Sequence, residues 1–353
     1  GAAQYARDAA PLNLTLVLDR STSMRGARLD KVKIAAHQII EQLTDDDMIS
    51  IVSFSDRAEV LIPAARVTDR MALRSQVSII RADGGTEIWH GLSAGMNEVR
   101  KHAHPRHVNH VILLTDGRTF GDEEKCLELA AEAAQEGIGL SAMGIGEEWN
   151  DDFLDKLASA TGGTSTYVNS PSAVIRFLND RVRNLGDAFA ERLQFTVAPD
   201  ADVQLESAFK LQPDPQPVEP EPQPIPIGML SHTRALTVLL QLQMPPLLKS
   251  GFRTVVRMDV TGDVLAANRR GYKVLSDISV EVAEKPEIED PPPAILEALG
   301  KLTLYRMQQK AEEALAGGHP REATRRLENL ATRLLAAGQE ELAQRAIVAA
   351  RRI

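Results

Sequence analysis

The segment LNLTLVLDRSTS, residues 12–23, joins an apolar run to a cluster of oxygen-bearing side chains. The run LNLTLVL, residues 12–18, is short and apolar, which is typical of a strand buried on both faces. Asp19, Ser21 and Ser23 follow it at alternate positions, so an extended loop would aim all three side chains at one point. In α/β proteins, ligands bind at the carboxyl ends of parallel strands, and this loop would lie at such an end.

Strands and helices alternate in the sequence from residue 12 to residue 185. Apolar runs predict strands, and apolar positions at helical spacing predict amphipathic helices. The expected strands cover residues 12–18, 48–54, 59–62, 108–115, 138–145 and 166–168, and the expected helices cover 27–43, about 70–80, 87–102, 123–136, 151–160 and 172–185. Thr68 or Asp69 is the expected cap of the second helix, and Gly137 is expected to end the fourth. This alternation predicts a doubly wound, mainly parallel sheet over residues 12–185.

Two further parts follow this α/β domain. Residues 186–290 alternate apolar and polar side chains in short segments, which predicts an antiparallel β-sandwich. Within it, QPDPQPVEPEPQPIP (212–226) is expected to form a stiff, exposed polyproline II loop, as a spacer or as a recognition motif. Residues 291–353 carry two apolar stripes separated by Gly317-Gly318, which predicts a helical hairpin or small bundle. Residues 1–11 are free to add a strand to the sandwich, which would make the α/β domain an insertion within it.

The composition restricts the class of protein. The net charge of −9 argues against nonspecific nucleic-acid binding, which requires basic surface. Cys126 is the single cysteine, so no intramolecular disulfide can form, which suits a reducing compartment. No apolar run reaches the length of a membrane span, and the first ten residues lack the apolar core of a signal peptide. These features favour a cytoplasmic protein, or an extracellular one if a signal has been removed.

Two more polar positions follow predicted turns and strands in the α/β domain. Thr86 comes after Gly84-Gly85, and Asp116 follows the apolar strand that ends at Thr115. Together with Asp19, Ser21 and Ser23 they offer two carboxylates and three hydroxyls, and no sulfur or imidazole. Hard divalent cations prefer such oxygen ligands. The set therefore predicts a Mg²⁺ site, with Mn²⁺ or Ca²⁺ as alternatives, that can still accept one carboxylate from outside.

A strand followed by D-x-S-x-S, then a Thr after a Gly-rich turn, then T-D-G after an apolar strand resembles the metal-ion-dependent adhesion site of von Willebrand factor A domains. The matching positions are Asp19, Ser21, Ser23, Thr86 and Asp116, and the resemblance covers residues 12–185. It implies a metal-dependent protein-binding module, with no enzymatic activity, in which an acidic residue of a partner completes the coordination of the metal. In the family the serines usually contact the metal directly, and the two aspartates often act through water.

The resemblance also implies two possible settings. Bacterial chains of this kind combine the domain with a sandwich and C-terminal helices, as do inter-α-trypsin-inhibitor heavy-chain-like proteins. Some intracellular bacterial members are thought to act as adaptors for MoxR-type AAA+ ATPases, and others are exported adhesins. The partner expected here is a protein that offers Asp or Glu, with an AAA+ ATPase as one candidate.

Several alternatives compete with this interpretation. The hydroxyls of Ser21, Ser23 and Thr86 could be ordinary helix caps. A Mg²⁺-dependent hydrolase of the phosphatase type would use a nucleophilic Asp with a second Asp two positions on, but Ser21 stands there. A structural scaffold with an idle metal site is the third alternative, in which the sandwich and helices provide the working surfaces.

Histidines and a cysteine invite other predictions. His102, His104, His107 and His110 are closely spaced, but the spacing matches no defined zinc pattern. His90 follows Trp89 near Thr86, so we expect both at the rim of the site, together with Arg20. We expect Cys126 to be a packed, inert thiol on a helix.

Overall fold

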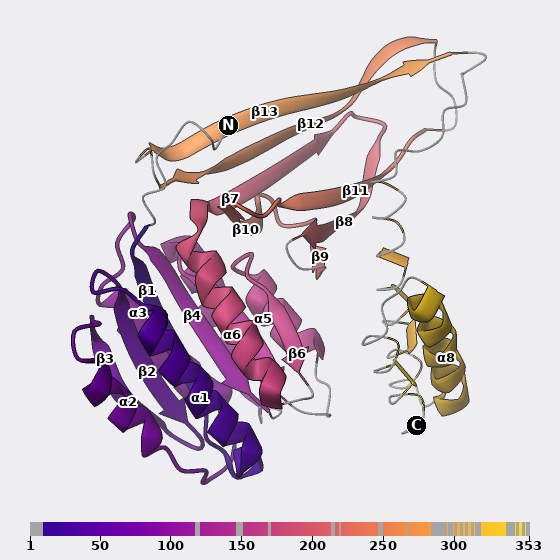
Figure 1. Cartoon of the computed structure of the whole chain (residues 1–353). Coiled ribbons are helices and arrows are strands. Elements are labelled where there is room, and N and C mark those ends of the chain that lie inside the picture. The colour runs from indigo at the N-terminus through magenta and orange to yellow at the C-terminus, as the bar shows by residue number, and fades with distance from the viewer. Residues whose placement is uncertain are drawn as a thin grey trace. The chain divides into compact units, whose positions relative to one another are not determined.

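A six-stranded sheet is the centre of the first part of the chain in the computed structural model (Figure 1). The structure describes residues 10–116, 121–145, 151–168, 171–212, 216–218, 220–245, 250–265, 267, 269–283 and 319–336, with single positions from 295 to 314 and from 343 to 350. The strands lie in the order β3-β2-β1-β4-β5-β6, and all pairs are parallel except β2 with β3. Their bounds are β1 Leu12–Asp19, β2 Met48–Phe54, β3 Ala58–Arg66, β4 Val108–Thr115, β5 Gly139–Ile145 and β6 Ser165–Val168.

Helices cover both faces of this sheet, as predicted for a doubly wound fold. One apolar cluster joins the sheet to α1, α2 and α6, and a second joins it to α3, α4 and α5. In Figure 1, α1 and α6 lie side by side across the sheet. The bounds are α1 Ala27–Gln42, α2 Arg70–Ser78, α3 Ile88–Arg100, α4 Glu123–Glu136, α5 Asp151–Ser159 and α6 Pro171–Gly186. Asp69 caps α2 by accepting a hydrogen bond from the Ala72 amide, and Gly137 ends α4 with a φ of 72°.

The strand order places the switch point of the sheet between β1 and β4. From β1 the chain moves outward to β2 and β3, then returns to pair β4 on the other side of β1. Every residue of β1 and β4 is buried, which explains their continuous apolar character. The loops after Asp19 and Thr115 therefore lie next to each other at the carboxyl ends of two central strands, where α/β sheets bind ligands.

An antiparallel sandwich follows the α/β part. A four-stranded sheet, β10-β7-β12-β13, packs against a three-stranded sheet, β11-β8-β9, through a shared apolar cluster. The strands are β7 Ala188–Pro199, β8 Gln204–Gln212, β9 Gln216–Val218, β10 Ile225–Ser231, β11 Thr237–Gln243, β12 Gly251–Val264 and β13 Arg269–Val282. The predicted antiparallel sandwich is confirmed.

The Pro-rich stretch 212–226 differs from the exposed loop that we predicted. Residues 216–218 form β9 at the edge of the smaller sheet. Proline is tolerated in an edge strand, because one side of the strand pairs with no other strand and needs no N–H donor there. Ile225 begins β10 and is buried in the sandwich core. The prediction of polyproline II structure is therefore wrong for these two segments, because edge pairing and apolar burial outweigh the local preference of proline. The prediction for residues 1–11 lies almost wholly outside the described residues.

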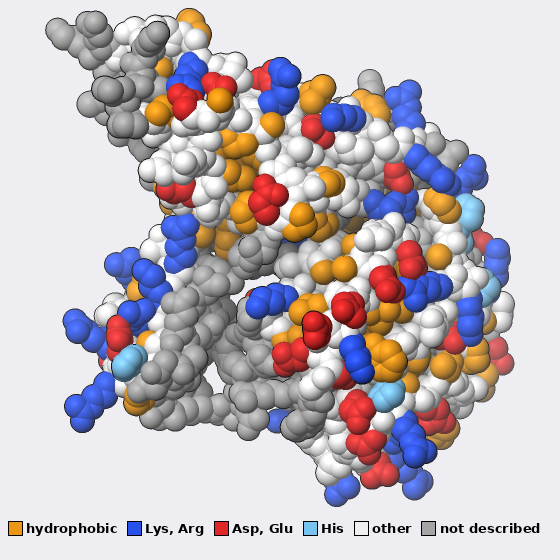
Figure 2. All heavy atoms as spheres, turned by 180° about the vertical axis from the view of Figure 1, so that it is seen from behind, with side chains coloured by type: hydrophobic (Ala, Val, Ile, Leu, Met, Phe, Trp, Pro, Cys, Tyr) orange, Lys and Arg blue, Asp and Glu red, His pale blue; other side chains and the backbone are white. Residues whose placement is uncertain are grey.

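The chain divides into two compact units, Gly1–Val282 and Ala283–Ile353. The first holds the α/β sheet and the sandwich together, and the division at residue 185/186 stays a prediction. In the second unit, α8 (Pro320–Ala336) buries the predicted stripe of Ala323, Leu327, Leu330 and Leu334. None of the described helices is long and apolar enough to cross a membrane. On the face shown in Figure 2, acidic and basic side chains are interspersed among the described residues.

Candidate metal centre at the carboxyl ends of β1 and β4

Asp19 is the last residue of β1, and its carboxylate is fully buried. One oxygen, Oδ1, accepts a hydrogen bond from the Ser21 amide at 2.7 Å, and Oδ2 accepts one from the Thr115 hydroxyl at 2.6 Å. Burial raises the pKa of Asp19 to about 6, against the opposing effect of these hydrogen bonds, and the negative charge of Asp116 adds to the rise. The Asp19 carboxylate is thus held from both central strands, and a nearby cation would stabilise its ionised form.

Hydrogen bonds connect the two serines of the first loop to Asp19 and to Asp116, which follows β4. The Ser21 and Ser23 hydroxyls lie 3.0 Å apart, and Ser23 Oγ donates to Asp116 Oδ1 at 2.7 Å. Ser21 precedes a short 3₁₀ turn, Thr22–Met24, but its side chain makes no capping hydrogen bond. The structure therefore brings four of the five predicted residues into one connected group of oxygens, and helix capping does not account for these serines.

Thr86 reaches this region through a different connection. The Thr22 hydroxyl donates to the Gly84 carbonyl at 2.9 Å, so the loop before Thr86 is attached to the first loop. Gly84 has a φ of +82°, and a Cβ there would lie 2.8 Å from an Asp56 carboxylate oxygen, so the close turn requires glycine. Thr86 is buried and lies two residues before α3, whose cap position is Glu87. Among the described contacts, the Thr86 side chain itself is not hydrogen-bonded to the other four.

Arg28, in the first turn of α1, was not among the predicted site residues. Its Nη1 lies 2.6 Å from Asp116 Oδ2 and 3.3 Å from the Ser23 carbonyl oxygen. The Asp116 side chain is completely buried, whereas Arg28 is 37% exposed. One Asp116 carboxylate oxygen therefore accepts from Ser23, and the other pairs with the Arg28 guanidinium. The sequence carried a signal for this contact, because a basic residue in the first turn of the helix after a loop lies close to that loop.

The donors of this group can be tested against the metal that the resemblance implies. Carboxylate and hydroxyl oxygens fit a hard divalent cation such as Mg²⁺. Within the described residues there is no cluster of three or more His, Cys, Asp or Glu side chains suited to a metal. Carboxylates alone therefore make no site in this part of the chain, and the serine and threonine hydroxyls would have to supply the remaining ligands.

The histidines do not gather into a zinc site among the described residues. His110 is buried on β4, its Nε2 lies 2.9 Å from Ser141 Oγ, and burial lowers its pKa to about 3. His102 Nε2 instead lies 3.1 Å from the carbonyl oxygen of Ala64. His90 is partly exposed and pairs with Glu87 at 2.9 Å. Cys126 is buried, and burial raises the pKa of its thiol to about 12, so the thiolate is scarcely populated near neutral pH.

Comparison with known proteins agrees with this architecture. A family model described as von Willebrand factor type A domain matches residues 13–181, and a model described as Sll0103-like, C-terminal alpha-helical domain matches residues 293–353. The protein sll0103 of Synechocystis sp. is 30% identical over 335 residues, which cover 91% of this chain and 78% of that protein. This chain belongs to the von Willebrand factor type A (VWA) domain family. Its combination with the C-terminal helical domain is shared with the Sll0103-like proteins.

Solved VWA structures share the fold. A von Willebrand factor type A protein from Catenulispora acidiphila has a TM-score of 0.75 and 19% identity, covering 95% of this chain and 82% of that chain. VWA2 of Sulfolobus acidocaldarius, described as an ArnB paralog, has a TM-score of 0.56 and 16% identity, covering 97% and 84%. Mouse inter-alpha-trypsin inhibitor heavy chain 4 is 26% identical over 212 residues, which are 57% of this chain. The VWA protein described here spans only 22% of that relative.

Proposed function

We propose that this VWA protein binds a partner protein through a Mg²⁺ ion held by Asp19, Ser21, Ser23, Thr86 and Asp116. The observation that supports this most is the connected group of Asp19, Ser21, Ser23 and Asp116 at the switch point of the sheet. VWA domains are known for metal-dependent protein interactions, so family and geometry support the same conclusion. Mn²⁺ and Ca²⁺ accept the same oxygen donors and are the alternative metals.

The charges of the site favour an acidic ligand. Asp19 and Asp116 together balance a divalent cation, and Arg28 adds a further positive charge through Asp116 Oδ2. A bound metal would then retain net positive charge, which attracts a carboxylate. The ligand that fits is an exposed Asp or Glu side chain of the partner, which supplies an oxygen to the metal. Serine stands two positions after Asp19, so no carboxylate pair for phosphoryl transfer is present there, and the proposed role is binding without catalysis.

A MoxR-type AAA+ ATPase in the cytoplasm is the partner class that we propose first. The resemblance to intracellular bacterial VWA proteins that are thought to act with such ATPases motivates this choice, and the single buried cysteine fits a reducing compartment. An exported adhesin would instead recognise an extracellular protein, so the compartment of the captured partner separates the two settings.

The proposal is tested by capture from a lysate of the source cells. The parent protein is used with Mg²⁺ and with EDTA, and the Ser23→Ala and Ser78→Ala variants are used with Mg²⁺. Ser23 is exposed, so the alanine variant should fold. Ser78 on α2 is the matched control, because its hydroxyl contacts His37 and the Arg74 carbonyl oxygen and none of the five site residues. We expect one partner to be retained by the parent and by Ser78→Ala in Mg²⁺ only. Equal retention of the partner in all four samples would mean that the partner binds to the sandwich or to the C-terminal helices and not to the metal site.

A further inference from the structure

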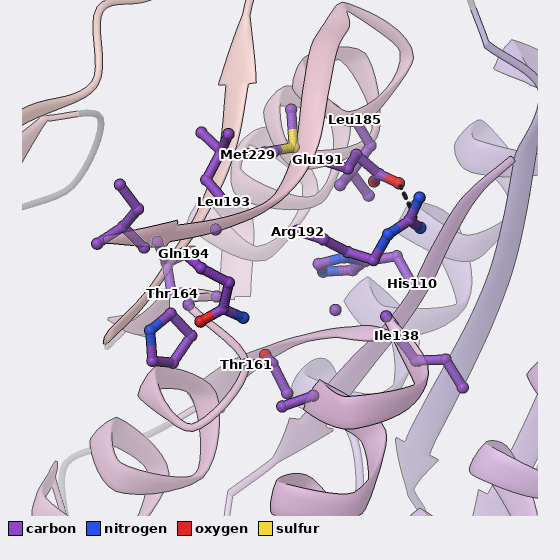
Figure 3. A pocket seen from close by; sticks show the side chains of 18 of the residues that line it. His110, Ile138, Thr161, Thr164, Leu185, Glu191, Arg192, Leu193, Gln194 and Met229 are labelled. Carbon is purple, nitrogen blue, oxygen red and sulfur yellow. Dashed lines mark ion pairs between the residues drawn. The ribbon is translucent and has the colours of Figure 1, made fainter. Parts of the chain in front are cut away.

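A cavity of about 70 Å³ lies between the α/β part and the sandwich, away from the proposed metal (Figure 3). It is bordered by the first residues of β5, by the turn between α5 and β6, and by β7, β8 and β10. The loops after Asp19 and Thr115 lie at the carboxyl ends of the strands, whereas Gly139 stands at the amino end of β5. The two places are therefore at opposite ends of the sheet.

Two buried polar side chains of this cavity lack a hydrogen-bond partner. Thr164 Oγ1 and Glu191 Oε2 are both buried without a hydrogen bond, and Glu191 Oε2 lies 3.8 Å from Arg192 Nη1 in an ion pair. Thr164 is only 2% exposed and Glu191 only 7%. Buried polar atoms in folded proteins are nearly always paired, so each such atom calls for water or a ligand. Both atoms belong to the lining of one cavity, and the cavity is larger than a single water requires.

The backbone of β7 is distorted at this point. Arg192 has a φ of 53° and is the single residue other than glycine with a positive φ among those described. The pairing of β7 with both of its neighbours shifts register next to it, which marks a bulge. Figure 3 shows the Arg192 side chain beside His110, with Glu191 joined to Arg192 by an ion pair. Such a left-handed conformation costs free energy, and such costs are concentrated at functional sites.

Several side chains around the cavity are hydrogen-bond donors. Lys210 is almost completely buried, and its Nζ donates to the carbonyl oxygens of Gly162 and Gly163 at 3.1 and 3.3 Å. Arg181 and Arg192 also line the space, and Arg192 pairs with Asp263. Burial raises the pKa of Glu191 to about 8, more than the nearby Arg192 lowers it, which favours the protonated acid, a form that can donate a hydrogen bond.

We propose that this cavity binds a small oxyanion, of the size of phosphate or acetate, at the junction of the α/β part and the sandwich. An anion supplies the acceptors that the Thr164 hydroxyl and the protonated Glu191 lack, and three basic side chains favour its charge. Because α6 leads directly into β7, and both contribute to the lining, a bound anion connects the two parts of the first unit. This inference is independent of the proposed metal site.

The test is a titration of the full chain with inorganic phosphate, sulfate and acetate in separate experiments. EDTA is present throughout, ionic strength is constant, and the readouts are calorimetry and the melting temperature. We expect saturable binding of at least one anion, with a rise in melting temperature. Thr164→Val and Glu191→Met should each weaken that binding roughly tenfold, since each removes one hydrogen bond to a charged ligand. Arg25→Met, which removes an exposed cation beside the loop after Asp19, at the other end of the sheet, should leave it unchanged.

Two outcomes would overturn the proposal. An absence of saturable binding for all three anions would mean that water fills the cavity. Equal binding by the parent and by Thr164→Val and Glu191→Met would place the anion elsewhere on the molecule. Thr164→Val preserves shape and charge, so its folding can be confirmed by circular dichroism before the titration.

Discussion

At the scale of single residues, the candidate metal site depends on oxygens that the fold has already fixed before any ion arrives. Asp19 is held by Ser21 and Thr115, and Asp116 is held by Ser23 and Arg28. This preorganisation lowers the entropy cost of assembling the ligands. The same bonds explain why these side chains tolerate burial, because each carboxylate oxygen has a donor.

Arg28 should weaken metal binding by this site. Its guanidinium neutralises Asp116 and would repel a divalent cation nearby. We expect Arg28→Met to raise the Mg²⁺ affinity roughly fivefold, equivalent to about 1 kcal/mol, in a calorimetric titration. Arg25→Met, which removes an exposed positive charge in the preceding turn, serves as the matched control. A fall in affinity for Arg28→Met would mean that the arginine mainly orients Asp116.

Glu191 should make the stability of the protein depend on pH. Its pKa is raised from 4.5 in the unfolded chain to about 8 in the folded protein, so the folded state binds the proton more tightly. The stabilisation is complete below pH 4.5 and is lost as the pH rises through about 8. Denaturation of the parent at pH 5 and pH 9 should show a loss of about 1 to 3 kcal/mol that Glu191→Gln does not show. Equal losses in both proteins would assign the pH dependence to other groups.

At the scale of helices and strands, the junction between the α/β part and the sandwich relies on a close backbone contact. Gly228 on β10 has a φ of +93°, and a Cβ there would overlap the carbonyl oxygen of Gly162. We expect Gly228→Ala to lower the free energy of unfolding by about 1 to 3 kcal/mol, because the strain and the overlap add.

Gly186→Ala is the matched control for this junction. Gly186 ends α6, and a Cβ there would meet no other atom within 4 Å. Chemical denaturation of both variants measures the difference. Similar stabilities for the two alanine variants would show that the backbones at Gly228 and Gly162 can separate without cost.

The elements that the sequence predicted well are those with a continuous or periodic apolar pattern. β2 and β4 match their predicted bounds, and α1 and α6 match within a residue, because each buries a full face. The start of β10, Ile225 and Pro226, was predicted as part of the polyproline II loop, since Pro226 and Gly228 interrupt the apolar pattern of this strand and its pairing with β7 is decided by tertiary contacts. The polyproline II prediction for residues 212–226 was wrong in part for the same reason. Local preference was weaker than the burial of Ile225 in the sandwich core.

In the candidate site, too, the features set by local sequence were predictable, and those set by contacts between distant parts of the sequence were not. Its residue types and their order were visible in the sequence, because parallel strands bring their carboxyl ends to one edge. The hydrogen bonds from Thr115 to Asp19 and the ion pair between Arg28 and Asp116 were not, since they join residues 96 and 88 positions apart. Arg192 likewise carries no sequence signal, because arginine rarely adopts a positive φ.

At the scale of the whole molecule, all five proposed metal ligands belong to the first compact unit. The second unit, Ala283–Ile353, contributes none of them. We therefore expect a chain that ends at Val282 to bind Mg²⁺ within about twofold of the full chain, because it retains all five ligands. Calorimetric titration of both chains checks this. A large loss of affinity on truncation would make the C-terminal helices part of the metal site.

The most direct test of the central claim is a calorimetric titration with Mg²⁺. It compares the parent with Ser23→Ala, Asp116→Asn and the control Ser78→Ala. We predict one saturable site in the parent and in Ser78→Ala, with affinity reduced tenfold or more in Ser23→Ala and Asp116→Asn. Equal affinity in all four proteins, or no binding by the parent, would contradict a metal site at the carboxyl ends of β1 and β4.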